Sequence, residues 1–331
     1  MSSSGLKTVS FVVVIAALGV VPWAGKAIFP GWWELVAHIM IKVFLNIGFG
    51  LCLWIMLQAG ELSLGQGAFI SIGAYVTGIL VTKYQILSSV WLSYFLGACV
   101  SGFMALLLGS ISVHLQRIFF LLVTWAFGEM MQPVLVSFQH PFGGSGGIVN
   151  IKPPEGLAFF AQSWTGYYYM ALGFALVVFL VIRRIGASKL GLIYKAIGQN
   201  EVLVTFSGLH VRFYKLQVFA LGCFLSGIGG GLMASYLTAI SPETFTFFTS
   251  LDIIMFNLIG GMNVIAGPIV GAIFLTCLNE FLFTVGYFKM ILYGLIIILI
   301  VTLLPGGITS LPAMIWKRRG DSAESPERNH G

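Results

Sequence analysis

Charged residues are scarce in this chain. Lys, Arg, Asp and Glu make up 8% of its 331 residues and hydrophobic residues make up 58%, and the mean hydropathy is +0.97. A water-soluble globular protein carries about 25% charged residues, so a soluble domain is excluded. We predict an all-α, polytopic transmembrane helical bundle with about 8–10 spans, because each span needs roughly 20 apolar residues.

Patterns for binding nucleotides and metals are also missing. The sequence contains no GxxxxGK[ST] motif, and therefore no P-loop of its own. Its four cysteines lie inside apolar segments without CxxC or Cys/His spacing, which indicates neither a metal site nor a disulfide framework. We expect no cofactor and no catalytic residues. The net charge of +6 is attributed to membrane orientation and lipid headgroups, and not to nucleic acid.

Long hydrophobic segments fill most of the chain, and at least one of them is expected to be short or broken. Ten segments predict helices by their length and polar breaks: residues 8–24, 33–59, 63–82, 87–111, 118–138, 165–182, 214–238, 248–261, 266–284 and 287–304. Residues 1–316 are expected to form one transmembrane domain. Residues 317–331 are expected to be a basic and then disordered cytoplasmic tail.

One basic island interrupts the apolar segments. It holds six cations between residues 183 and 215: Arg183, Arg184, Lys189, Lys195, Arg212 and Lys215. Lys and Arg on short loops stay on the cytoplasmic side of a membrane. This rule and the basic cluster at 317–319 predict that the island and both termini are cytoplasmic.

The segment 248–261 is short for a span and leads into a turn that contains Gly260, Gly261 and Asn263. Lipid cannot satisfy the backbone groups that Gly and Pro free in such a turn. We therefore expect the turn to be shielded by protein or to line a cavity. A short crossing is favoured, because a re-entrant segment would place the basic tail outside.

A Gly-rich stretch at residues 60–75 has two interpretations. Small residues at three- and four-residue spacing favour close helix packing. Polar residues at the start of a helix also indicate a pore lining, because a half-helix N-terminus offers amides and a positive dipole end to an anionic group. The candidate translocation path combines this helix start with the turn above: Ser63, Gln66, Gly67, Gly260, Gly261 and Asn263.

Ionisable residues within the predicted spans are few. Lys42, Glu129 and Asp252 lie inside segments, and Glu61 and Glu280 lie near segment ends. Such residues are costly in lipid and face a pathway or a partner. A self-sufficient secondary carrier that uses Glu129 or Asp252 is therefore an alternative, as are a packing hydrogen bond and an interfacial cap.

The longest connector, residues 139–164, is rich in Gly and Pro and is predicted to lie outside. Its composition indicates a surface connector, with a lid or a docking surface for an external partner as the alternative.

Several motifs occur together in an order typical of one family. They are LSLGQGAF at 62–69 with Gly73-Ala74-Tyr75; Lys195-Ala196-Ile197 with Asn200-Glu201 and Gly208; Tyr214-Lys215-Leu216; Ser241-Pro242; and Gly260-Gly261 with Gly267-Pro268 and Gly271. On this ordered set, the chain resembles the permease subunits of branched-chain amino acid ABC importers, in particular the M-type subunit. Permeases for urea and short amides are close relatives.

The resemblance implies a transport subunit, not an enzyme, in a bacterial inner membrane. Its implied partners, besides the lipid bilayer, are a second homologous permease, two cytoplasmic ABC ATPases that hydrolyse the ATP, and a periplasmic solute-binding protein. Branched-chain amino acids are the implied substrate, with urea or amides as the alternative. The implied mechanism is alternating access driven by the ATPases.

The resemblance also implies that the cytoplasmic segment 183–213 couples the ATPases to the spans. In many such importers a short helix with an acidic-Ala-Ala pattern and a later Gly enters a cleft of the ATPase. Here one short helix is expected over 195–208, and alanines are absent between Glu201 and Gly208. The implied coupling residues are Lys195, Ala196, Gly198, Asn200, Glu201 and Gly208.

Overall fold

The computed structural model describes residues 31–84, 90–151, 164–283, 286–304 and 306–310, together with Gly19, Val21, Pro22 and Gly25. Most of the expected first span at 8–24 and all of the expected tail at 317–331 lie outside the described residues. Within the described ranges, helices dominate and the strands form a single two-stranded ladder.

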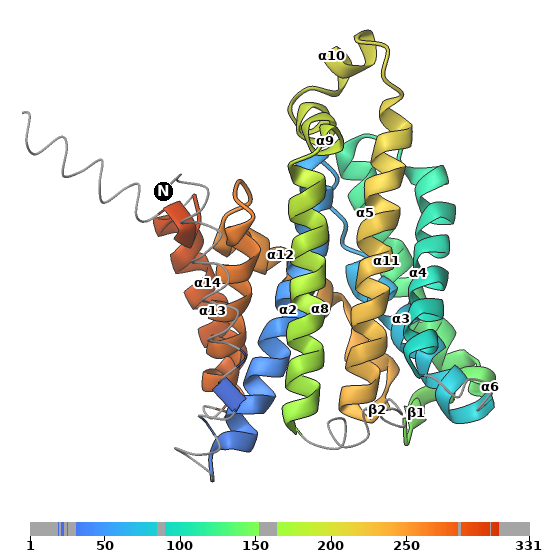
Figure 1. Cartoon of the computed structure of the whole chain (residues 1–331), viewed down its shortest axis with the longest axis vertical. Coiled ribbons are helices and arrows are strands. Elements are labelled where there is room, and N and C mark those ends of the chain that lie inside the picture. The colour runs from blue at the N-terminus through green and yellow to red at the C-terminus, as the bar shows by residue number, and fades with distance from the viewer. Residues whose placement is uncertain are drawn as a thin grey trace, which may run out of the picture.

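Seven described helices are long and apolar enough to cross a membrane, and they run side by side in one bundle (Figure 1). They are α2 (Trp33–Gln58), α4 (Val90–Ser112), α5 (Arg117–Ser137), α8 (Trp164–Gly186), α11 (Val211–Leu237), α13 (Ala266–Phe283) and α14 (Lys289–Leu303), the last continued by η5 (Ile308–Ser310). The prediction of an all-α, multi-pass membrane bundle is confirmed.

Two further apolar helices are short. They are α3 (Gln66–Ile79), which the π-helical η1 (Leu80–Tyr84) extends, and α12 (Phe247–Gly260). At 1.5 Å per residue, the 14 residues of α12 cover about 21 Å, less than the roughly 30 Å of a bilayer core. The expectation of a short helix over 248–261 is therefore confirmed.

The expected helix start at residue 63 is wrong, because α3 begins at Gln66. The backbone before it is bonded to side chains instead of to a helix. The Leu64 N–H donates to Thr124 Oγ1 (3.2 Å), and the Gly65 N–H donates to Ser63 Oγ (3.3 Å). The Thr124 hydroxyl of α5 thus takes a backbone N–H that would otherwise belong to the first helical turn. Hydropathy does not register such a contact.

Short elements close the two ends of the bundle. At one end, β1 (Ile148–Val149) pairs antiparallel with β2 (Ala239–Ile240), so that Ile148 lies opposite Ile240; we name this the β1–β2 end. The opposite end, the α10 end, carries α9 (Lys189–Gln199) and α10 (Glu201–Phe206), as Figure 1 shows. The remaining short elements are α6 (Gln139–Phe142), η2 (Gly144–Gly146), η3 (Pro242–Phe245) and η4 (Gly286–Phe288).

The centre of the bundle is α11, which packs against α2, α3 and α4. Glycines allow this close approach: a Cβ on Gly230 would lie 2.1 Å from the Ile70 carbonyl oxygen, and one on Gly73 would lie 2.2 Å from that of Gly227. Glycines of the Gly-rich stretch at 60–75 and those of α11 between residues 227 and 231 thus serve helix packing. Since the helices touch backbone to backbone here, the middle of the bundle is rigid.

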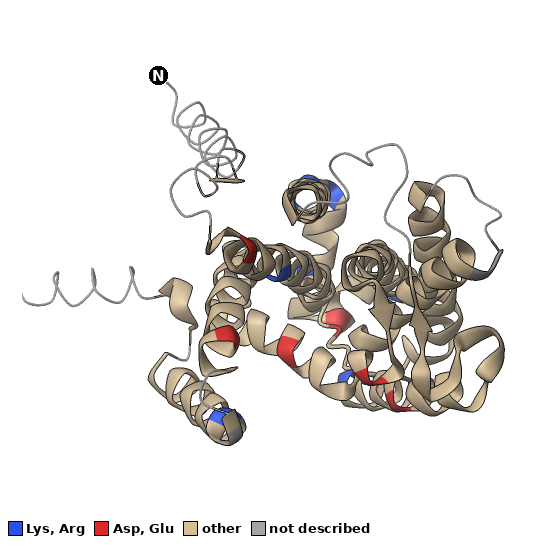
Figure 2. Ribbon diagram, turned by 90° about the horizontal axis from the view of Figure 1, so that it is seen from below, with Lys and Arg blue, Asp and Glu red and all other residues tan. Residues whose placement is uncertain are grey.

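Charges are sparse across the bundle (Figure 2). One pair joins α2 to α13, with Lys42 Nζ 2.6 Å from Glu280 Oε1. Beside it, Asn46 Nδ2 donates to Thr276 Oγ1 (2.9 Å). We name these contacts the α2–α13 seam. Their spacing of four residues on each helix aligns them along one interface.

Candidate functional site

The two short helices begin next to each other, about halfway along the bundle. Gln66, the first residue of α3, donates a hydrogen bond to Ser226 Oγ near the middle of α11. The Gly67 N–H donates to Ser250 Oγ in the first turn of α12 (2.9 Å). Two helix N-termini, each a positive dipole end, therefore meet at mid-depth.

From this meeting point the helices run to opposite ends. The last turn of α3 reaches the β1–β2 end, where a Cβ on Gly78 would contact Ile148 and Ile240. After α12, the carbonyl of Met262 accepts from Trp54 Nε1 (2.9 Å) at the α10 end of α2. The arrangement is that of a broken membrane helix pair, which needs shielding by protein or a cavity.

A narrow hollow, with no room for a water molecule in this structure, lies directly at the two helix starts, and we name it the midplane hollow. Its lining comes from the start of α3, from α5 and from the η3–α12 segment: Leu64, Ala68, Trp125, Gly128, Glu129, Phe245, Thr246, Phe247 and Ser250. The one charged side chain in this lining is Glu129, on the exposed side of α5. An acid at this depth marks a pathway or a protein partner.

Much of α5 is left uncovered by the described part of the chain. Its buried residues are Phe120, Thr124 and Leu135, whereas apolar residues such as Ile118 (73% exposed) and Met130 (53%) are open. The exposed face of α5 runs along the midplane hollow. A second protein on this face would therefore complete the wall of the hollow.

The predicted path residues do not form one cluster. Ser63 and Gln66 are buried at the α3 start, and the Gly67 backbone contacts Ser250. Gly260 lies at the other end of α12, where a Cβ would be 1.8 Å from the Gly267 carbonyl oxygen. The second group is completed by a buried Gly261 and an exposed Asn263.

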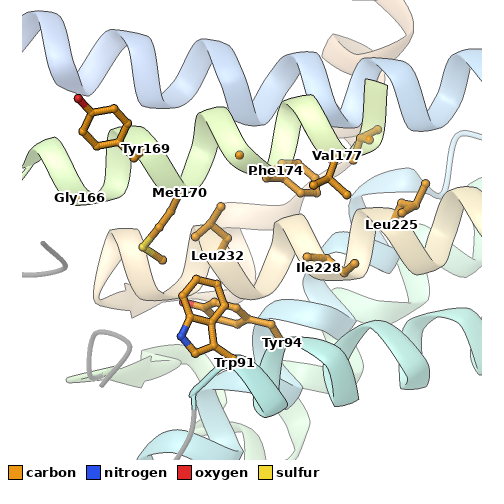
Figure 3. A pocket seen from close by; sticks show the side chains of 12 residues that line it. Trp91, Tyr94, Gly166, Tyr169, Met170, Phe174, Val177, Leu225, Ile228 and Leu232 are labelled. Carbon is orange, nitrogen blue, oxygen red and sulfur yellow. The ribbon is translucent and has the colours of Figure 1, made fainter. Parts of the chain in front are cut away.

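A larger cavity of about 550 Å³ lies between α4, α8 and α11 (Figure 3). Its walls are apolar and aromatic, with Trp91 and Tyr94 on one side and Met170 and Phe174 on the other. Not one of its lining residues is charged. The cavity thus offers no partner for the charged ends of an amino acid, unlike the midplane hollow.

The α10 end holds the predicted coupling residues, but they form two helices and not the single helix expected over 195–208. The break is at Asn200, whose Oδ1 accepts the N–H groups of Val202 (3.1 Å) and Leu203 (3.2 Å) and so caps α10. Asn at this position is a strong N-cap, which ends α9 and starts a new helix. Gly208, with φ +81°, ends the α10 segment.

A small apolar core joins α9, α10 and the start of α11. It consists of Ile197, Val204 and Val211, with Ala196 packed against it, while Lys195 is exposed. In α9, burial raises the pKa of the Tyr194 hydroxyl, and this group donates to Gln217 Oε1 (3.3 Å). The segment is therefore folded against the bundle.

The outer face of α10 is apolar and open. Val202 (61% exposed), Leu203 (63%) and Phe206 (85%) point away from the small core. Phe213, at the start of α11, is 63% exposed as well. Val202, Leu203 and Phe206 form what we name the α10 face. The helix α10 lies at the tip of the molecule in Figure 1.

Three charged groups that the sequence analysis placed apart meet beneath this face. Lys215 Nζ lies 2.7 Å from Glu201 Oε2 and 2.9 Å from Glu61 Oε1. Sequence reasoning counted Lys215 as an island charge, yet it is 2% exposed. It also missed Ser226 and Ser250, since single serines in apolar helices carry no spacing signal. The α2–α13 seam could have been found from the four-residue spacing of Lys42 and Asn46 in α2 and of Thr276 and Glu280 in α13.

The bundle, the paired half-helices and the mostly apolar lining define a class: a multi-pass helical membrane protein built for passage of a solute. The family described as "Branched-chain amino acid transport system / permease component" matches residues 35–301. The chain belongs to this family, as its motifs indicated, and it is a membrane permease, not a catalytic enzyme.

Two relatives are similar over most of the chain. The high-affinity branched-chain amino acid transport system permease protein LivM of Salmonella typhimurium is 26% identical, covering 87% of this chain and 72% of its own length. The protein of the same name from Escherichia coli is 25% identical, covering 89% and 73%. The ribose import permease protein RbsC of Haemophilus influenzae is 28% identical, over 43% of this chain and 48% of its own length. No solved structure matches.

Proposed function

We propose that the chain is one permease subunit of an ATP-binding-cassette importer for branched-chain amino acids in a bacterial inner membrane. The observation that carries this proposal is the α10 face: a short helix outside the spans that presents Val202, Leu203 and Phe206 to solvent. Apolar side chains in water mark a protein interface. An ATPase cleft that receives a short helix is a partner of this shape.

The same proposal orients the molecule. The α10 end, with the basic residues of the island, is cytoplasmic, which agrees with the distribution of Lys and Arg. The β1–β2 end then faces the periplasm and receives a solute-binding protein. Both termini are cytoplasmic in this arrangement.

A second homologous permease is proposed to cover the exposed face of α5. It would shield Glu129 from lipid and close the midplane hollow into a translocation path. In that path, Glu129 offers a partner for a substrate ammonium group, and the starts of α3 and α12 favour a carboxylate. Ser63, Gln66 and Gly67 belong to this path, whereas Gly260, Gly261 and Asn263 are assigned to its α10 end.

The substrate proposal rests on the names of the LivM relatives and on the zwitterion match of the hollow. Urea or an amide carries no charges for the two helix starts and Glu129, so these substrates fit the hollow less well. Asp252, one of two acids considered for a self-sufficient carrier, accepts a hydrogen bond from the Tyr293 hydroxyl (3.0 Å). This contact supports a packing role.

The proposal is tested by purifying the tagged chain from its host membrane and identifying what co-purifies. An ATPase pair is expected with the unchanged chain and is expected to be lost with Phe206→Asp and Leu203→Asp together. Lys189→Met, an exposed change on α9, is the control and keeps the pair. Purification of the unchanged chain alone, with solute flux in liposomes driven by an ion gradient, would show a carrier instead.

A further inference from the structure

The cytoplasmic segment touches the spans through four charged side chains and one backbone carbonyl, that of Gly198. We name this cluster the junction: Glu61, Arg117, Gly198, Glu201 and Lys215. We propose that Lys215 is a positioning residue that ties α10 to the connection between α2 and α3, so that movement of α10 reaches the midplane hollow. This proposal rests on the proposed function, since it needs an ATPase acting on α10.

Lys215 joins three elements at one nitrogen atom. It belongs to α11, donates to Glu201 in α10 at 2.7 Å, and pairs with Glu61, in the connection, at 2.9 Å. Lys215 is 2% exposed and Glu61 is fully buried, whereas the Glu201 side chain is 43% exposed. Electrostatic contacts out of water are strong, so Glu61 and Glu201 are expected to move together.

A second contact holds the other side of the junction. Arg117 Nη2, from the first residue of α5, donates to the Gly198 carbonyl at 2.7 Å. The same guanidinium lies against Gly60, where a Cβ would be 2.9 Å from Nη2. A Cβ on Gly198 would be 2.3 Å from the Gln58 carbonyl oxygen. The last turn of α9 therefore rests directly on the end of α2 and the beginning of the connection.

The connection leads to the midplane hollow within a few residues. Residues 61–65 are non-helical, and Gln66 begins α3. Leu64 lines the hollow, and its N–H is held by Thr124. Since only two residues separate Glu61 from Leu64, little chain is available to absorb a shift at Glu61 before it reaches Leu64.

Stability alone does not explain a buried ion cluster. Replacing a buried ion pair with apolar residues of similar volume is often neutral or stabilising. The charges of the junction connect α10 to the segment between α2 and α3. Without them α10 packs mainly on α9 and the start of α11. The geometry thus points to a mechanical link.

The test measures whether a movement imposed on α10 reaches Leu64. The transporter complex, with its own ATPases, carries Leu64→Cys or Thr205→Cys, and the partly or fully exposed Cys99 and Cys277 are changed to Ser. Reaction with a water-soluble maleimide is timed with and without ATP and vanadate, which trap the ATPases. With Glu201 present, trapping is expected to change the rate at both positions, by about tenfold at Leu64→Cys.

Glu201→Ala cuts the link but leaves the buried Lys215–Glu61 pair, so the bundle keeps its charge balance. The effect of trapping on the maleimide reaction rate of Leu64→Cys is then expected to fall by about tenfold, which is the scale of one hydrogen bond to a charged group. The change at Thr205→Cys is expected to persist. Glu201→Gln, which keeps an acceptor for Lys215, retains most of the response, and Lys189→Met retains all of it.

The outcomes separate this proposal from the proposed function. If trapping changes the labelling rate of Leu64→Cys equally with and without Glu201, the Lys215–Glu201 contact does not transmit the movement and this proposal is wrong, while the ATPase partnership stands. If Glu201→Ala removes the ATPases from the complex, Glu201 belongs to the ATPase contact and the relay is again wrong. If no ATPase accompanies the unchanged chain, both proposals fall.

Discussion

The middle of the bundle and its α10 end are held together by different chemistry. At the middle, glycine backbones touch and neutral hydroxyls bond, as in the contacts of Gly73 and Ser226. At the α10 end, a single buried ammonium, Lys215, holds two carboxylates. Close packing tolerates little displacement, whereas an ion cluster links elements that share little surface. The comparison separates a rigid frame from a segment that is attached to it through charges.

The largest expected effect on stability is at the ion cluster. Lys215→Met leaves Glu61 buried without its cation and is expected to lower the free energy of unfolding by about 3–5 kcal/mol. Lys42→Met is the matched control, since the Lys42 and Glu280 side chains are 37% and 27% exposed, and its loss is expected to be smaller. Denaturation in detergent micelles measures both. Equal losses of stability in Lys215→Met and Lys42→Met would contradict the distinction between the buried ion cluster and the α2–α13 seam.

The next effect concerns the glycine contacts of the middle. Gly73→Leu places a Cβ 2.2 Å from a carbonyl oxygen of α11, and this overpacking is expected to destabilise the bundle by about 1–3 kcal/mol. At Gly173 nothing lies within 4 Å of a Cβ, so Gly173→Leu is expected to be tolerated. A thermal melt that shows Gly173→Leu to be the worse of the two would contradict the rigid-middle description.

An effect of similar size is expected from the hydrogen bond at the α3 start. Ser226→Ala removes the acceptor of the buried Gln66 amide and is expected to cost about 1–3 kcal/mol. The matched variant Ser110→Ala removes an exposed hydroxyl and is expected to be silent. Comparing their unfolding transitions shows whether neutral polar contacts hold the helix start.

The smallest effect on stability is expected on the α10 face. Phe206→Ser changes a side chain that is 85% exposed, so the free energy of unfolding is expected to change by no more than about 0.5 kcal/mol. Binding of ATPases is expected to weaken at the same time. A large stability loss in this variant would mean that the α10 face is part of the packed frame.

Hydropathy predicted the architecture well, because crossing a membrane leaves few choices for a backbone. The short length of α12 could be inferred from hydropathy in the same way. The start of α3 could not, since Thr124 and Ser226 from other helices decide where the helix begins. The break at Asn200 was readable as an N-cap signal before Glu201, but the family pattern suggested one helix.

The burial of Lys215 illustrates the limit of reading charge from composition. On the sequence, Lys215 belongs to a basic island and is attributed to topology. In the fold, it pairs with Glu61, which lies 154 positions earlier in the chain. Pairing over this separation depends on how α2, α10 and α11 meet, which hydrophobic periodicity does not encode.

The central claim is that the α10 face meets a partner in the cytoplasm, and labelling of Phe206→Cys tests it most directly. The exposed cysteine reacts with a membrane-impermeant maleimide either in intact cells or in inverted membrane vesicles. We predict labelling in inverted vesicles that have been stripped of ATPases, protection when the ATPases are restored, and no labelling in intact cells. Labelling of Phe206→Cys from outside intact cells would contradict the account.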